Sequence, residues 1–101
     1  SSWGNIDIAV YSDPKLSATP TTTAVSCATT ATAAPASLLS SRTTVTFVNN
    51  SAVTIYLGGS AVTTANGIPL LPGAAFTDDV SAAPYYCRVA SGTADLRVLE
   101  N

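Results

Sequence analysis

The sequence contains no histidine, and this absence removes the most common catalytic machinery. A serine or cysteine nucleophile is usually activated by a neighbouring imidazole, so neither a Ser–His nor a Cys–His pair can be assembled. Zinc sites need clusters of cysteine or histidine, and the two cysteines lie far apart in the chain. The GxxxxGK[ST] and GxGxxG nucleotide-binding patterns are also missing. We therefore predict a protein that is not an enzyme and that carries no metal and no cofactor.

Charge is scarce as well, because charged residues make up only 10% of the chain, against about a quarter of an ordinary soluble domain. Four cations and six acids give a net charge of −2. Four scattered cations cannot follow a phosphate backbone, so we expect no nucleic-acid partner. A surface of Ser, Thr, Ala and Asn is typical of a protein that packs beside copies of itself, or of a secreted adhesive domain. We therefore expect a homo-oligomer.

Long apolar runs are missing too. No segment approaches the roughly 20 apolar residues that a transmembrane helix needs, so we expect no membrane partner. Hydrophobic residues make up 47% of the chain, but alanine supplies much of that figure. The length of 101 residues suits a single domain with one core.

What the sequence does contain is a series of short alternating segments, rich in β-branched residues and separated by Gly, Pro and Asn. This pattern predicts strands, and no window shows a helical period of useful length. The predicted strands cover residues 5–12, 21–32 (as one strand or two), 42–48, 52–57, 61–64, 74–80, 85–90 and 93–100. About seven or eight short strands predict an all-β fold, a small antiparallel β-sandwich or barrel-like domain.

Two connections between these strands carry further expectations. Residues 49–51 (Asn-Asn-Ser) form a turn cluster between two alternating segments, and we predict that residues 42–57 form a β-hairpin there. Residues 68–73 are mostly apolar and contain two prolines, which predicts a rigid loop. That loop either folds over the open end of the sandwich or docks on a neighbouring protein.

Cys27 and Cys87 are the only cysteines. They either remain two small buried thiols, since free cysteine is among the most buried residues, or form a disulfide that joins an early strand to a late one. We predict the disulfide. The residues that we expect to contact another subunit or a partner protein are aromatic or apolar: Trp3, Tyr56, Ile68, Leu70 and Leu71.

From residue 42 onward, four segments follow one another in a distinctive order: RTTVTFVNN at 42–50, VTIYLGG at 53–59, VTTANGIPLLPG at 62–73 and ASGTADLRVLE at 90–100. Together they resemble a short module of tailed-phage and prophage gene products. The resemblance implies a β-sandwich virion protein, placed on the capsid or the tail. It divides the single domain 1–101 into variable N-terminal strands with a crossing (1–41) and a phage-like β module (42–101).

The resemblance, the small size and the low charge together imply a capsid decoration or cement protein that stabilises the phage head. Such a protein is located in the virion, binds the major capsid protein or another virion protein, and forms an oligomer, with a trimer favoured. The alternative is a receptor-binding or glycan-binding module at a tail or fibre tip, which would use exposed tyrosines and polar loops.

Overall fold

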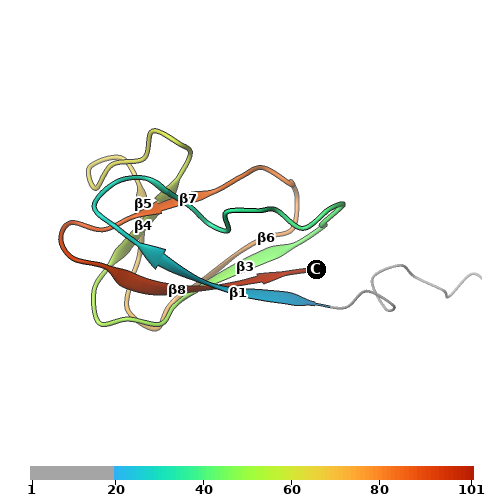
Figure 1. The fold of residues 1–101 in the computed structure, drawn as a ribbon, viewed down its shortest axis with the longest axis horizontal. Coiled ribbons are helices and arrows are strands. Elements are labelled where there is room, and N and C mark those ends of the chain that lie inside the picture. The colour runs from blue at the N-terminus through green and yellow to red at the C-terminus, as the bar shows by residue number, and fades with distance from the viewer. Residues whose placement is uncertain (1–19) are drawn as a thin grey trace, which may run out of the picture.

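The computed structural model describes residues 20–101, which form a sandwich of two four-stranded antiparallel sheets (Figure 1). The strand predicted at residues 5–12 lies outside the described residues. The strands are β1 (Thr21–Cys27), β2 (Thr32–Ala33), β3 (Val45–Asn49), β4 (Ile55–Gly58), β5 (Ile68–Leu70), β6 (Ala75–Asp78), β7 (Tyr86–Arg88) and β8 (Ala94–Glu100). The prediction of an all-β sandwich is confirmed.

Most connections cross from one sheet to the other. Sheet A has the order β1-β8-β3-β6, and sheet B has the order β2-β7-β4-β5. Only β4 and β5 are both consecutive in the chain and neighbours in one sheet. This is the strand order of a jelly roll, in which two Greek keys interlock across a sandwich.

The hairpin predicted across residues 49–51 is wrong. β3 pairs with β6 and β8 in sheet A, whereas β4 pairs with β5 and β7 in sheet B. Val45 and Phe47 of β3 and Ile55 and Leu57 of β4 are all at most 2% exposed. Both strands therefore alternate because they face the same core from opposite sheets, and alternation alone does not distinguish this arrangement from a hairpin.

Asn49 holds the crossing between β3 and β4. Its Nδ2 donates to the carbonyl oxygens of Val53 (2.7 Å) and Leu70 (2.8 Å), and its Oδ1 accepts from the backbone N–H of Ser51 (3.0 Å). Three hydrogen bonds from one buried amide satisfy backbone groups where the chain leaves sheet A.

Two further segments differ from expectation. Residues 61–64, predicted as a strand, form turns, because the backbone N–H of Thr63 donates to Asn66 Oδ1 (2.8 Å) and that of Gly67 donates to the Thr63 carbonyl (2.9 Å). Residues 68–70, predicted as part of a loop, form β5. The range 21–32 contributes two strands, β1 and β2, as one of the two expectations allowed.

The core lies between the sheets and contains few large side chains. Phe47 is fully buried, and its ring centroid lies 5.0 Å from that of Tyr85 and 6.3 Å from that of Phe76. The rest of the core is mainly Val, Leu, Ile and Ala. With so few large side chains, single interactions that join the sheets carry a large part of the stability.

Candidate interaction surface

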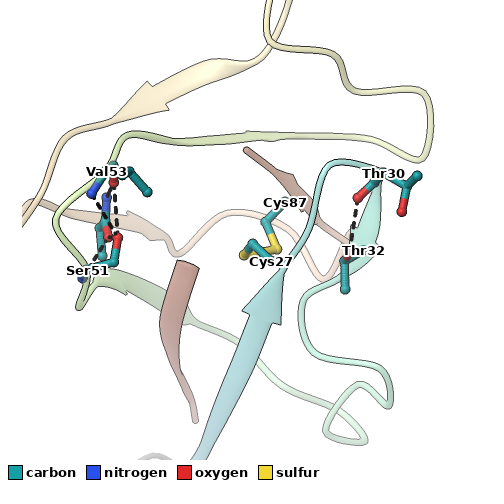
Figure 2. Close-up of a disulfide and its surroundings, with 7 residues drawn as sticks. Cys27, Thr30, Thr32, Ser51, Val53 and Cys87 are labelled. Atoms are coloured by element: carbon teal, nitrogen blue, oxygen red, sulfur yellow. Dashed lines mark hydrogen bonds between the residues drawn. A yellow bond between two sulfur atoms is a disulfide. The ribbon is translucent and has the colours of Figure 1, made fainter. Parts of the chain in front are cut away.

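The predicted disulfide between Cys27 and Cys87 is confirmed, and it joins β1 of sheet A to β7 of sheet B (Figure 2). Both residues are fully buried, and their Cα atoms lie 5.6 Å apart. Because these are the only cysteines, the protein has no free thiol. The disulfide therefore holds the two sheets together and offers no reactive sulfur to a substrate.

The other predicted contact residues do not form one surface. Ile68 and Leu71 are 63% and 59% exposed, but Leu70 is 5% exposed and belongs to the core. Tyr56 is half-buried on the outer face of sheet B. Trp3 lies outside the described residues. Of the predicted set, Ile68 and Leu71 are the two whose side chains the structure shows to be available to a partner.

The outer face of sheet B is covered by the segment that connects β4 to β5. Val62, at the centre of this segment, is only 3% exposed. A Cβ at Gly58 would lie 2.8 Å from Val62 Cγ2, and a Cβ at Gly67 would lie 2.7 Å from Tyr56 Cβ. The two glycines therefore let the connection lie directly on the sheet, and it covers part of Tyr56.

The outer face of sheet A has no such cover among the described residues. Its outward side chains are exposed or half-buried; those of β1, β3 and β6 are small or β-branched, and those of β8 are an acid, a base and a leucine. They are Thr22, Ala24, Ser26, Thr46, Val48, Ala75, Thr77, Asp95, Arg97 and Leu99. An open groove of about 460 Å³ crosses this face, lined mainly by residues of β1, β3 and β8.

Two apolar side chains on this face were not among the predicted contacts. Val48 is 36% exposed and Leu99 is 40% exposed, and both line the groove. The signal was present in the alternation, because Leu99 shares the outward phase of Asp95 and Arg97 in the last strand. A single exposed apolar residue is ordinary, but Val48 and Leu99 line the same groove, so together they form a small apolar patch that a partner can cover.

The charges on this face neutralise each other. Arg97 Nη2 donates to Asp95 Oδ2 at 2.8 Å, and Arg97 Nε lies 2.9 and 3.0 Å from the two Asp95 oxygens. Hydrogen bonds from Arg97 and Asn50 lower the pKa of Asp95, and Asp95 raises the pKa of Arg97. The face therefore carries no net charge and offers mainly apolar and hydroxyl groups around an open groove, which suits contact with a protein better than contact with a polyanion.

At the far edge of sheet A, Asp78 organises the connection from β6 to β7. Its carboxylate accepts hydrogen bonds from Tyr85 Oη (2.7 Å), the Val80 backbone N–H (2.9 Å), and the Ser81 hydroxyl (2.8 Å) and backbone N–H (3.1 Å). These bonds, that from Tyr85 foremost, lower the pKa of Asp78 to about 2. Burial and the adjacent carboxylate raise the pKa of Tyr85 to about 12.

We expect Asp78 to make the domain less stable in acid. Its pKa in the folded state is about 2, below the ordinary 3.8, so its contribution is present above pH 3.8 and is lost as the pH falls toward 2. Thermal melts at pH steps across this window should show the loss in the unaltered protein and a flatter profile in Asp78→Asn. Asp79→Asn is the matched control, because Asp79 accepts none of these hydrogen bonds. An unchanged acid profile in Asp78→Asn would contradict the assignment.

Within residues 20–101, no group of three or more acidic or cysteine side chains is placed to hold a metal ion. The same part of the chain has no helix of the length and hydropathy needed to span a membrane. Comparisons with family models, with curated proteins and with solved structures gave no match. The fold therefore establishes a small all-β two-sheet sandwich domain.

Proposed function

We propose that this protein is a non-enzymatic structural component of a bacteriophage particle, most concretely a capsid decoration protein that binds the major capsid protein. The observation that carries the proposal is the contrast between the two outer faces. The face of sheet B is partly covered by the chain's own β4–β5 connection, whereas within residues 20–101 the face of sheet A is uncovered and carries an open groove without net charge. We propose that the face of sheet A rests on the capsid.

Three further features support this setting. The jelly-roll strand order recurs in viral capsid proteins, although a fold by itself does not assign a function. The resemblance of residues 42–101 to modules of tailed-phage and prophage proteins favours a phage particle over other settings for such a domain. A buried disulfide suits a protein that works outside the reducing cytosol, as the proteins of a released virion do.

The proposed mechanism is mechanical bridging between adjacent capsid subunits. The groove on sheet A can take an apolar side chain between Val48 and Leu99, while the surrounding threonines offer hydroxyl groups to polar atoms of the partner. Because the disulfide joins the two sheets, the sandwich resists shear when the subunits beneath it are pulled apart. The bound protein thus adds buried surface area at the junction between adjacent capsid subunits. Internal pressure pulls these subunits apart, so the added contacts oppose their separation.

We expect the purified protein to co-sediment with expanded capsids of the phage that encodes it and to raise their resistance to heat and chelators. Leu99→Glu, which places a charge in the groove, should weaken binding by about tenfold or more. Leu71→Glu is the matched control, since Leu71 is exposed but lies outside the groove. If Leu71→Glu loses capsid binding and Leu99→Glu does not, the docking site lies on the surface of residues 68–71. If the unaltered protein neither binds nor protects capsids, the proposal is contradicted.

The alternative proposal is a receptor-binding or glycan-binding module at a tail or fibre tip. It draws support from the strand order, because lectins also use jelly rolls. Among residues 20–101, however, Phe47, Phe76 and Tyr85 pack on one another, and Tyr56 lies partly under the β4–β5 connection. Binding to glycans on an array or to host cells, together with no binding to capsids, would favour this alternative.

A further inference from the structure

Three of the four edge strands of the sandwich are poor templates for another strand. β2 has only two residues. β5 contains Pro69, which has no N–H to donate. β6 has four residues, ends at Asp78 and is followed at once by Asp79. Short length, proline and charge are the usual features that protect a sheet edge from pairing with another chain.

The fourth edge strand, β1, has none of these features. It spans seven residues, Thr21–Cys27, without charge, proline or glycine. All seven pair with β8, from Thr21 opposite Glu100 to Cys27 opposite Ala94. Among the described residues, no strand pairs with the other side of β1. Within residues 20–101, a long, uncharged edge rich in threonine is therefore open on one side.

We propose that β1 pairs with β1 of a second copy of this chain, antiparallel and around a two-fold axis. The two copies of sheet A then form one continuous eight-stranded sheet. A two-fold interface requires a patch that is complementary to itself, because the same residues meet from both sides. This inference is independent of the capsid role, and it predicts a dimer in place of the trimer expected from the sequence.

The sequence of β1 meets the requirement of self-complementarity. With the axis at Ala24, each Thr22 lies opposite the partner's Ser26, and each Thr23 lies opposite the partner's Val25. The side chain at the axis is then a methyl group on both copies, at the closest approach of the two strands. On the outer face the nearest charges belong to Arg97 and Asp95 of β8, which are paired with each other, so no unpaired like charges face each other across the axis.

The expected affinity follows from the size of the contact. A seven-residue antiparallel pair supplies about seven backbone hydrogen bonds, close to the roughly ten of an average protein interface. It buries less than the about 1,200 Å² that stable interfaces usually need. We therefore expect a dimer that dissociates on dilution through the micromolar range.

Analytical ultracentrifugation of the full chain over a concentration series tests the inference. The unaltered protein should move from the mass of one chain, 10.2 kDa, to that of two chains. Ala24→Lys places two ammonium groups opposite each other at the axis and should raise the dissociation constant by about tenfold or more. Ala75→Lys is the matched control: it is the same change at an exposed, outward position on β6, the opposite edge of sheet A, and should leave the dimer intact.

Hydrogen exchange provides a second measurement that does not depend on a variant. Protection of the β1 amides should rise with protein concentration, while that of the β6 amides should not. A mass of one chain at concentrations up to about 1 mM, a mass of three chains, or equal weakening by both lysine variants would overturn the inference. If the protein dimerises but does not bind capsids, this inference stands and the proposed function is wrong. If the protein binds capsids as a monomer, the proposed function stands and this inference is wrong.

Discussion

Loss of the Cys27–Cys87 disulfide should lower the free energy of unfolding by about 4 kcal/mol, since the bond closes a loop with a sequence separation of 60. Small domains are stable by only about 5–15 kcal/mol, so the change is a large share of the total. It corresponds to a drop in Tm of roughly 15 °C or more. The bond also joins the edge strand of sheet A to sheet B, because Cys27 is the last residue of β1 and Cys87 belongs to β7.

Urea unfolding with and without reductant measures this loss. The double variant Cys27→Ala with Cys87→Ala should show a similar loss, and adding reductant to it should change nothing, which controls for effects of the reductant on other groups. A difference below about 1 kcal/mol between oxidised and reduced protein would contradict the prediction. If the reduced protein keeps its far-UV spectrum in dilute buffer, the sandwich topology itself does not depend on the bond.

The alternation that predicted the strands matches the burial pattern of β3, β4 and β8, because one face of each of these strands lies in the core. Val45, Phe47, Leu96 and Val98 alternate with polar or small residues, and all four are at most 1% exposed. Alternation shows which side chains share one face of a strand. It does not show to which sheet the strand belongs. For that reason β3 and β4 were predicted as strands, whereas the connection through Asn49 was predicted as a hairpin although it crosses between the sheets.

The candidate surface was less predictable because it depends on what covers each sheet. Tyr56 and Val48 both lie in outward phases, yet among residues 20–101 only Tyr56 is partly covered, since Val62 and the two flanking glycines bring the β4–β5 connection onto sheet B. Residues 61–64 of that connection were predicted as a strand, and the sequence shows no sign of the sheet on which the connection lies. Within residues 20–101, the openness of β1 and of the sheet A face thus follows from tertiary structure, which local patterns do not specify.

The buried ion pair between Arg42 and Glu100 is the feature that the sequence predicted least, because its two residues are 58 positions apart. Arg42 Nη1 lies 2.8 Å from Glu100 Oε2, and both side chains are 1% exposed. Glu100 Oε2 also accepts from the Leu39 backbone N–H (3.0 Å), and Arg42 Nη2 donates to the Ala83 carbonyl (2.6 Å). The pair therefore joins the crossing before β3, the end of β8 and the β6–β7 connection at one point.

Breaking this pair from either side should cost about 3–5 kcal/mol, because the remaining charge is then buried without its counter-ion. Glu100→Gln keeps an oxygen acceptor for Leu39 but removes the negative charge, and Arg42→Met keeps the length of the side chain but removes the positive charge. The variant with both changes should lose less than the sum of the two, since no uncompensated charge is left in the core. Urea unfolding of the four proteins gives the coupling free energy directly.

The exposed pair on sheet A supplies the control for this experiment. Arg97 and Asp95 make an ion pair of the same length, 2.8 Å, but their side chains are 56% and 37% exposed. Water and salt screen such a pair, so Arg97→Met should cost much less stability than either single variant of the buried pair. If the Arg42 and Glu100 variants are additive, or no worse than Arg97→Met, the buried pair does not hold the three segments together. A large coupling at the buried pair alone would show that burial, at equal distance, decides how much an ion pair stabilises this sandwich.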